Sequence, residues 1–235
     1  MSKNKTPIII LNYKTYTEST GKNAVKLSQY VQEASDETGI NMAIAPQAVD
    51  LYPIIESVDI PVYAQHMDAI TPGGHTGSAL PEALYETGIE GSLINHSEKR
   101  LTLADIDVVV EKTRQLDLTS VLCTNNVKTS AACASFNPDF IAIEPPELIG
   151  TGIPVSQASP EVVENTVEEI HKINKNISVL CGAGISTGED MKAALDLGAQ
   201  GVLLASGIIK AENQKEALID LVSLILFFLE VIKGY

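Results

Sequence analysis

Short apolar segments alternate along this chain with longer segments in which apolar residues recur at helical spacing. The short segments are rich in β-branched residues, which predicts strands. These strands are predicted at Ile8–Leu11, Met42–Ala45, Val62–Ala64, Ser92–Ile94, Ser120–Cys123, Phe140–Ile143, Ser178–Cys181 and Val202–Leu204. Each longer segment carries one apolar stripe opposite charged positions, which predicts a helix that packs on one face. The helices are predicted to begin near Lys22, Ala48, Leu80, Asp105, Lys128, Glu161, Gly188 and Lys210.

Strand and helix segments alternate without a break, and this predicts an α/β fold with a parallel sheet. Successive strands lie roughly 20 to 40 residues apart, an interval that fits βα units. A length of 235 residues is usual for a single (β/α)8 barrel. No linker rich in Pro, Gly or Ser and no block of charge divides the sequence. We therefore expect one domain over residues 1–235.

The charge of the chain bears on its partners. There are 16 basic and 30 acidic residues, which gives a formal net charge of −14 at pH 7. A polyanion would meet net repulsion, so the charge argues against a nucleic-acid partner. An anionic small substrate would need a local positive potential from a lysine and from helix N-termini.

Cysteine usage and the apolar segments favour a cytoplasmic protein. Cys123, Cys133 and Cys181 are odd in number and widely spaced, so they predict neither a disulfide framework nor a zinc site. The first apolar segment, Ile8–Leu11, is too short for the core of a secretory signal. The most apolar window, Leu221–Leu229, falls short of the roughly 20 residues that span a bilayer. We expect a buried final helix there, part of which could be a subunit contact, and no association with a membrane.

Chemically distinctive residues stand directly after several predicted strands, at positions that meet at one mouth of a barrel. Asn12 and Lys14 follow the first strand, His96 and Glu98 follow the fourth, and Glu144 follows the sixth. The other strand ends carry small residues, which are Gly150-Thr151-Gly152 after Glu144, Gly182-Ala183-Gly184 after the seventh strand and Ala205-Ser206-Gly207 after the eighth. Small residues let backbone N–H groups approach an anion, and barrels usually bind phosphate at the last two of these loops. A phosphorylated small molecule is therefore the expected substrate.

Four motifs at these strand ends resemble the triosephosphate isomerase family. They are Asn12-Tyr13-Lys14, Asn95-His96-Ser97-Glu98, the run from Ile143 to Gly152, and Cys181-Gly182-Ala183-Gly184. The resemblance covers nearly the whole chain and implies a TIM barrel. It also implies that the chain interconverts dihydroxyacetone phosphate and D-glyceraldehyde 3-phosphate, in glycolysis and gluconeogenesis, with no cofactor and no metal ion.

Further residues bear on assembly and on the branch of the family. The segment from Gly73 to Ser78 resembles the protruding third loop through which subunits of that family dock on one another. Tyr13 and Pro146 stand where many members carry Trp and Val, and together with the short chain they resemble the compact archaeal branch. Tetramers are usual in that branch. The resemblance thus implies a homo-oligomer, with a tetramer favoured over a dimer.

The resemblance implies three catalytic side chains, Glu144, His96 and Lys14. One carboxylate, that of Glu144, can take a proton from one carbon and return it to the next. General-base catalysis contributes roughly 10² to 10⁴ in rate, which alone cannot explain an enzyme of this class. Electrostatic help from His96 and Lys14 at the enediolate oxygens is therefore required. The plain alternatives are a solvated loop carboxylate, a structural histidine and an exposed lysine. The positions of Glu144, His96 and Lys14 after apolar strands favour a catalytic role over these alternatives.

Several supporting roles follow from the same resemblance. Ser97 and Glu98 suit the first turn of a helix, whose N–H groups would keep the His96 ring neutral. The family is a standard example of a glutamate base, a neutral histidine and a closing loop acting together. Asn12 is expected to position the substrate and Lys14, and Glu98 to hold charge beside Lys14.

A lid and a phosphate site are implied as well. The run from Pro145 to Thr151 is expected to close over the substrate, because an enediolate phosphate left in water can eliminate its phosphate. The backbone N–H groups expected to surround the phosphate are those of Ile149, Gly150, Gly184, Ala205 and Ser206. Many relatives carry Ser at the position of Gly184 and Gly-Gly at Ala205-Ser206, but backbone donors survive such changes. A turn with positive φ is a competing reason for Gly182 and Gly184.

Two other functions stay open at the level of the sequence. A different phosphate-binding barrel, such as a ribulose-phosphate epimerase or an indole-pathway synthase, would share the small-residue loops but would need a metal cluster or another acid–base pair. A barrel that has lost catalysis and acts as a binding protein would be expected to have replaced Glu144 or Lys14. Both residues are present.

Overall fold

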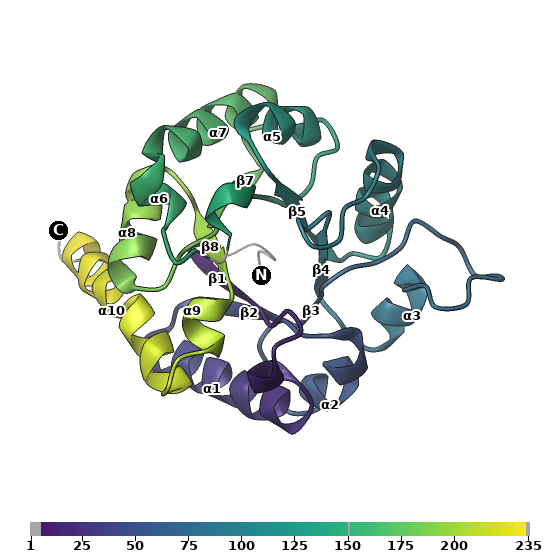
Figure 1. The fold of residues 1–235 in the computed structure, drawn as a ribbon, viewed down its shortest axis with the longest axis horizontal. Coiled ribbons are helices and arrows are strands. Elements are labelled where there is room, and N and C mark those ends of the chain that lie inside the picture. Colours follow the sequence, from purple (N-terminus) through teal and green to yellow (C-terminus); the bar gives the residue numbers. More distant parts are fainter. Residues whose placement is uncertain (1–5, 150, 234–235) are drawn as a thin grey trace.

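The computed structural model describes residues 6–149 and 151–233 (Figure 1). Within them lie eight strands, each within one residue of its predicted boundaries. They are β1 (Ile8–Asn12), β2 (Asn41–Ala45), β3 (Tyr63–Ala64), β4 (Gly91–Ile94), β5 (Thr119–Thr124), β6 (Phe140–Ile143), β7 (Ser178–Gly182) and β8 (Gly201–Leu204). All the paired strands run parallel, in the order β2-β1-β8-β7-β6-β5-β4-β3. A single parallel bridge from Ile44 to Val62 joins the two ends of this sheet, so the predicted (β/α)8 barrel is confirmed.

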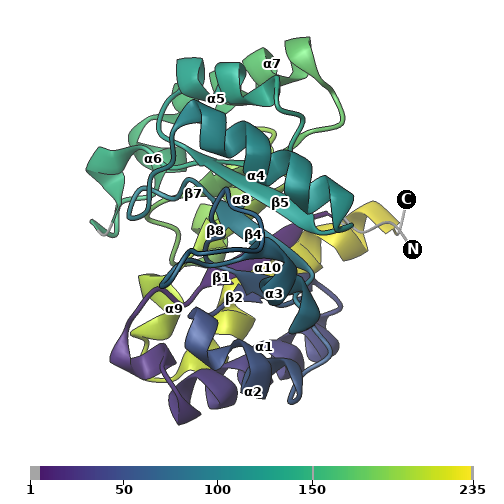
Figure 2. The same cartoon turned by 90° about the vertical axis from the view of Figure 1, so that its right-hand side faces the viewer.

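Helices surround the ring of strands in Figure 1, and Figure 2 shows α5 and α7 above the strands with α1 and α2 below them. The α-helices are α1 (Lys22–Thr38), α2 (Leu51–Ile55), α3 (Pro81–Glu86), α4 (Leu103–Gln115), α5 (Val127–Ala134), α6 (Val155–Ala158), α7 (Pro160–Ile173), α8 (Gly188–Asp196), α9 (Ser206–Ile209) and α10 (Gln214–Lys233). Three short 3-10 helices are η1 (Thr17–Ser19), η2 (Ala48–Asp50) and η3 (Pro146–Leu148). Among the described residues, no helix is long and apolar enough to cross a membrane.

Both faces of the strands are buried, and this explains why the strands read as continuous apolar runs. Successive side chains of a strand point to opposite faces. On β1, Ile8 and Ile10 pack with Phe140 and Leu180 in one cluster of strand residues. Ile9 and Leu11 belong to a second cluster that includes the apolar stripes of the helices. The barrel therefore has a filled interior and an outer layer between strands and helices.

The last part of the chain differs from the prediction. The final helix begins at Gln214, later than the predicted start near Lys210, because a separate short helix, α9, ends at Ile209 and Lys210 is its C-cap. The carbonyl oxygen of the Asn213 side chain accepts the backbone N–H of Glu216 at 3.3 Å, which starts the new helix. Helix α6 was not predicted, because four residues are too few to show a helical period.

Candidate active site

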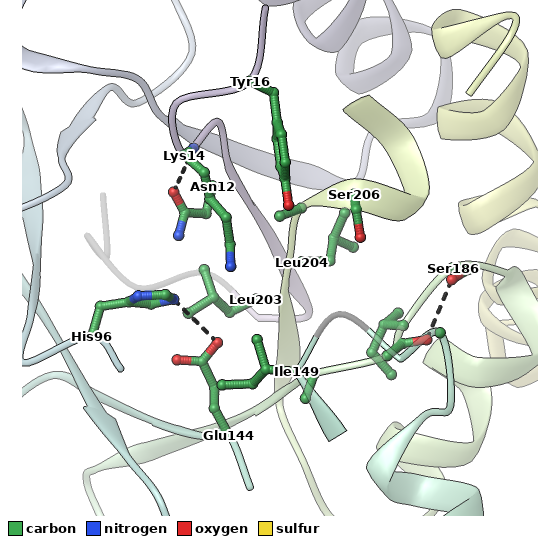
Figure 3. Close-up of a pocket in the computed structure, with 15 residues that line it drawn as sticks. Asn12, Lys14, Tyr16, His96, Glu144, Ile149, Ser186, Leu203, Leu204 and Ser206 are labelled. Carbon is green, nitrogen blue, oxygen red and sulfur yellow. Dashed lines mark hydrogen bonds and ion pairs between the residues drawn. The ribbon is translucent and has the colours of Figure 1, made fainter. Parts of the chain in front are cut away.

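The carboxyl ends of the strands surround one pocket (Figure 3). Its free volume is about 50 Å³, and a neighbouring hollow of about 450 Å³ shares Asn12, Lys14, Tyr16 and His96 with it. The predicted residues that line the pocket are Asn12, Lys14, His96, Glu144, Ile149, Gly184, Ala205 and Ser206. Glu98 lines the neighbouring hollow instead, and Gly150 lies outside the described residues. The structure thus brings residues from five distant strand ends to one place.

Glu144 directly follows β6, and its side chain is buried against the base of the pocket. Its backbone N–H donates to the carbonyl of Thr124 at 2.9 Å, which continues the strand ladder up to the site. The residue is only 6% exposed. Gly182 on β7 leaves room for it, because a Cβ atom there would collide with Cγ of Glu144. Gly182 is not at positive φ, so close approach, and not a turn, is the reason for this glycine.

His96 lies opposite Glu144, with 3.5 Å between Nε2 of the ring and Oε1 of the carboxylate. Within the described part of the chain, His96 Nε2 and Glu144 Oε2 are both buried and have no hydrogen-bond partner. A buried polar atom without a partner costs about 1–3 kcal/mol, so each such atom needs an explanation. A polar ligand in the pocket that paired with both atoms would remove this cost.

The protonation of the His96 ring follows from its other nitrogen. The backbone N–H of Glu98 donates to Nδ1 at 3.2 Å, whereas the Glu98 carboxylate is 3.6 Å away, too far for a hydrogen bond. An acceptor at Nδ1 requires a free lone pair, which imidazolium lacks, so the geometry favours a neutral ring with its proton on Nε2. The expected helical turn is absent: Ser97 and Glu98 form a hydrogen-bonded turn, and α4 begins only at Leu103.

The loop after β4 is held by Asn95, which explains why no helix starts there. The buried amide of Asn95 donates to the carbonyl of Cys123 at 3.0 Å and accepts the N–H of Leu101 at 2.9 Å. Arg100 donates to the Asn95 carbonyl at 3.0 Å. The backbone of Asn95 is left-handed, at φ 59°. These contacts hold the turn that carries His96 and shape it as a loop.

The backbone N–H and the backbone carbonyl of Lys14 are both held by hydrogen bonds to side chains. Its φ is 47°, a conformation uncommon outside glycine. Its N–H donates to the Asn12 side chain at 3.0 Å, and its carbonyl accepts from the Gln65 amide at 2.9 Å. The side chain is mostly buried, and Nζ forms an ion pair with Oε1 of the exposed Glu98 at 3.0 Å. Asn12 therefore contacts the backbone of Lys14, and Glu98 lies beside the Lys14 charge.

Small residues form the other end of the pocket. Gly184 has φ 76°, and an added Cβ would collide with the carbonyl oxygen of Ile153. The loop after β7 therefore packs directly against Ile153, which lies two residues past the segment that was predicted to form a lid. Ala205 precedes the first turn of α9, and Ser206 begins it. Ile149, just after η3, faces the same space.

Sequence reasoning missed several residues that line the pocket or its neighbour. They are Thr15, Tyr16, Gln65, His66, Lys99, Ile185, Ser186, Leu203 and Leu204. Gln65 directly follows β3, so the strand-end rule that singled out Lys14 could have found it. Tyr16 lies four residues past its strand, and no pattern in the sequence marks it.

Cysteine and metal chemistry have little support at this site. The three cysteines are free and buried. Burial, and next the negative charge of Glu144, raise the pKa of the Cys123 thiol. Burial raises the pKa of Cys181 to about 12. These thiols stay protonated at neutral pH and are poor nucleophiles. No group of three or more His, Cys, Asp or Glu residues in the described chain is placed to hold a metal ion.

Comparisons with known proteins agree with the geometry. The sequence model of the triosephosphate isomerase family matches residues 7–225. Proteins named triosephosphate isomerase from Methanobrevibacter smithii and Methanobacterium bryantii are 65% and 60% identical to the chain, and the one from Methanocaldococcus jannaschii is 58% identical. Each alignment covers 93% of this chain and 98%, 97% and 100% of the respective relative. These relatives are archaeal, like the branch that the sequence resembles.

Proposed function

Because the chain belongs to the triosephosphate isomerase family, we propose that Glu144, His96 and Lys14 carry out the reaction of that family at this pocket. The chain is an intramolecular aldose–ketose isomerase, and it interconverts dihydroxyacetone phosphate and D-glyceraldehyde 3-phosphate. The observation that carries the residue assignment is the pair of buried atoms without a partner, His96 Nε2 and Glu144 Oε2, which flank one cavity.

Glu144 is the proposed base. Its carboxylate takes a proton from C1 of dihydroxyacetone phosphate and returns it to C2, so one group serves both carbons. Glu144 Oε2 has no hydrogen-bond partner among the described residues and is available for a C–H proton, whereas an oxygen held in an ion pair would be a weaker base. The absence of a side chain at Gly182 supports this role, because the Glu144 side chain occupies the space that a Cβ atom there would fill.

His96 and Lys14 are the proposed electrostatic partners of the enediolate. The neutral His96 ring gives its Nε2 proton to the oxygen on C2 and takes the hydroxyl proton from the oxygen on C1, so it stabilises the negative charge that develops on both oxygens and ends neutral. Lys14 Nζ contributes a positive charge, and a charge-assisted hydrogen bond to the substrate would be stronger than one between neutral groups. Because the chain has a net charge of −14, this local cation also opposes the repulsion that an anionic substrate meets.

The phosphate group is proposed to bind at the end of the pocket built from small residues. Ile149, Gly184, Ala205 and Ser206 line the cavity there, and the backbone N–H groups of these residues and of Gly150 are the proposed donors. We propose that the run from Pro145 to Thr151 closes over the substrate and excludes water, so that the enediolate does not eliminate phosphate. Gly184 packs directly against Ile153, two residues past this lid, so the C-terminal flank of the lid is anchored beside the phosphate site.

We propose that the chain works as one domain in a cytoplasmic homotetramer, in glycolysis and gluconeogenesis. The loop between β3 and α3 supports docking on another copy, since it projects from the barrel in Figure 1 and residues 71–78 are all exposed. At its base, the Asp68 carboxylate accepts the N–H of Ala79 at 2.7 Å and contacts the His66 ring at 2.9 Å. Light scattering is expected to give about four times the mass of one chain; a monomer would contradict this.

A coupled assay tests the proposed function most directly. Purified protein is expected to convert D-glyceraldehyde 3-phosphate to dihydroxyacetone phosphate at a rate that EDTA does not change. A rate that falls with EDTA and recovers with added metal would instead indicate epimerase-like chemistry. Tight binding of 2-phosphoglycolate without any turnover would indicate a barrel that binds but does not catalyse.

A further inference from the structure

We propose that Tyr16 is a phosphate-binding residue of this site, and that Lys210 holds its ring and brings a second positive charge to the phosphate. The inference rests on the proposed function for the identity of the substrate. Tyr16 is half-buried and lines both the pocket and the neighbouring hollow. In Figure 3 its ring stands between Lys14 and Ser206, with the hydroxyl directed into the cavity.

The charges around the pocket give a reason for a second cation. Lys14 is the only lysine or arginine among the described residues that line the pocket. Its Nζ already lies 3.0 Å from a carboxylate oxygen of Glu98, so part of its charge is neutralised. A phosphate ester carries close to two negative charges at neutral pH, and the protein as a whole is strongly acidic. One partly neutralised lysine is a weak counterpart for such a group.

Lys210 is the proposed second cation, and the ring of Tyr16 holds its ammonium group near the pocket. Its Nζ lies 4.5 Å from the ring centroid, well within the range of a cation–π interaction. Lys210 is the C-cap of α9, and its backbone N–H donates to the carbonyl of Ser206 at 3.1 Å. Since Ser206 borders the pocket, the tyrosine ring joins the loop after β1 to the short helix after β8. The cation is kept near the phosphate end without entering the pocket.

The backbone of the loop that carries Tyr16 is closed by hydrogen bonds that do not involve the tyrosine side chain. The backbone carbonyl of Tyr16 accepts the N–H of Ser19 at 3.1 Å, the hydroxyl of Ser19 at 3.2 Å and the hydroxyl of Thr20 at 2.8 Å. The loop is therefore closed by main-chain acceptors. A change of the ring or of its hydroxyl should leave the backbone in place, which makes the proposal testable by substitution.

Two variants separate the hydroxyl from the cation. For Tyr16→Phe, we expect Kd for 2-phosphoglycolate and KM for D-glyceraldehyde 3-phosphate to rise by about tenfold, because a hydrogen bond to a charged group is lost. The value of kcat should stay within about twofold of that of the unaltered enzyme. For Lys210→Met, the same constants should rise by about threefold, and their dependence on salt concentration should become weaker.

The controls distinguish phosphate binding from a structural role. Lys26 lies over the ring of Tyr30 on α1, with Nζ 5.4 Å from the centroid, away from the pocket. Lys26→Met and Tyr30→Phe are matched changes that should leave both constants unaltered. The substrate glyceraldehyde, which has no phosphate, gives a second control. Its kcat/KM should not change in Tyr16→Phe, whereas a disturbed active site would lower it.

The outcomes decide each part separately. Unchanged binding of 2-phosphoglycolate by Tyr16→Phe would overturn the role of the hydroxyl, and unchanged binding by Lys210→Met would overturn the role of the cation. A loss of glyceraldehyde turnover in Tyr16→Phe would overturn phosphate specificity. Binding of inorganic phosphate is measured in parallel by calorimetry. If the unaltered protein shows no isomerisation while Tyr16→Phe still weakens phosphate binding, the proposed function fails and this inference stands.

Discussion

The two ends of the pocket are built in opposite ways. At the end proposed for proton transfer, Lys14, His96 and Glu144 extend side chains from three strand ends, and each side chain is aimed by neighbouring hydrogen bonds or by close packing. At the end proposed for phosphate binding, Gly184 and Ala205 offer little besides backbone. Function depends on which side chains are present at the first end. At the second it depends on the small size of Gly184 and Ala205, beside which Tyr16 is the one side chain proposed to bind the phosphate.

This difference predicts two kinds of sensitivity. A change of functional group at the proton-transfer end should lower kcat while the fold stays intact, because the loops there are held by other residues, such as Asn95. A change of size at the phosphate end should act through geometry, and so it should affect binding and stability together. The following predictions test this contrast.

Glu144→Gln should give the largest effect. The amide has nearly the same shape as the carboxylate but is not a base, so kcat should fall by at least about 10². Kd for 2-phosphoglycolate, measured by calorimetry, should stay within about tenfold of its original value. Glu161→Gln is the matched control, since this exposed glutamate lies in the first turn of α7 and does not line the pocket. Near-normal turnover of Glu144→Gln would mean that another group is the base.

His96→Gln should follow, with kcat lower by about 10², the usual loss when one donor to a developing oxyanion is removed. KM should change much less, because the interaction strengthens mainly in the transition state. His171→Gln provides the control, because His171 is in the last turn of α7 and is not among the residues that line the pocket; its ring contacts the carbonyl of Ile177 at 3.2 Å. A loss confined to KM would assign His96 to substrate binding alone.

Gly184→Ala tests the phosphate end. The new methyl group would collide with the carbonyl oxygen of Ile153, at a backbone φ that alanine rarely adopts. We expect a loss of about 1–3 kcal/mol in the free energy of unfolding, measured by urea denaturation, and a rise of about tenfold in Kd for 2-phosphoglycolate. Ala205→Gly removes a methyl group at the same end and keeps every backbone donor, so its Kd should change by less than about threefold. Equal effects of the two variants would remove the contrast.

The sequence predicted the strands and the residues that follow them, but not the shape of every loop at the pocket. Strand positions were correct because burial on both faces leaves an unmistakable apolar run, as at Phe140–Ile143. Lys14, His96 and Glu144 could be located because chain order alone determines which residue follows a strand. The turn after His96 was wrongly expected to be helical, because it is shaped by the Asn95 side chain through contacts with Cys123, which is distant in sequence.

Other features lay beyond the sequence for physical reasons. The left-handed backbone of Lys14 and of Ala183 is imposed by surrounding contacts against the preference of these residue types. The approach of Gly184 to Ile153 joins segments that are remote in the chain. Tyr16 reaches the pocket from a loop without any periodic pattern. Each of these is a tertiary contact, and such contacts leave no local signal.

Glu98→Gln should give the smallest effect. It tests the charge of Lys14, which acts on the substrate at the proton-transfer end and also attracts the phosphate. The Glu98 side chain is 58% exposed, and its ion pair with Lys14 at 3.0 Å should contribute no more than about 1 kcal/mol to stability. Without the carboxylate, Lys14 is free to interact fully with an anion, so binding of 2-phosphoglycolate should tighten by about threefold at low ionic strength and less at high salt. Weaker binding would show instead that Glu98 aims Lys14 at the substrate. In that case Glu98 would be a further side chain that the proton-transfer end needs in a fixed position, and binding of the phosphate would depend on Glu98 as well.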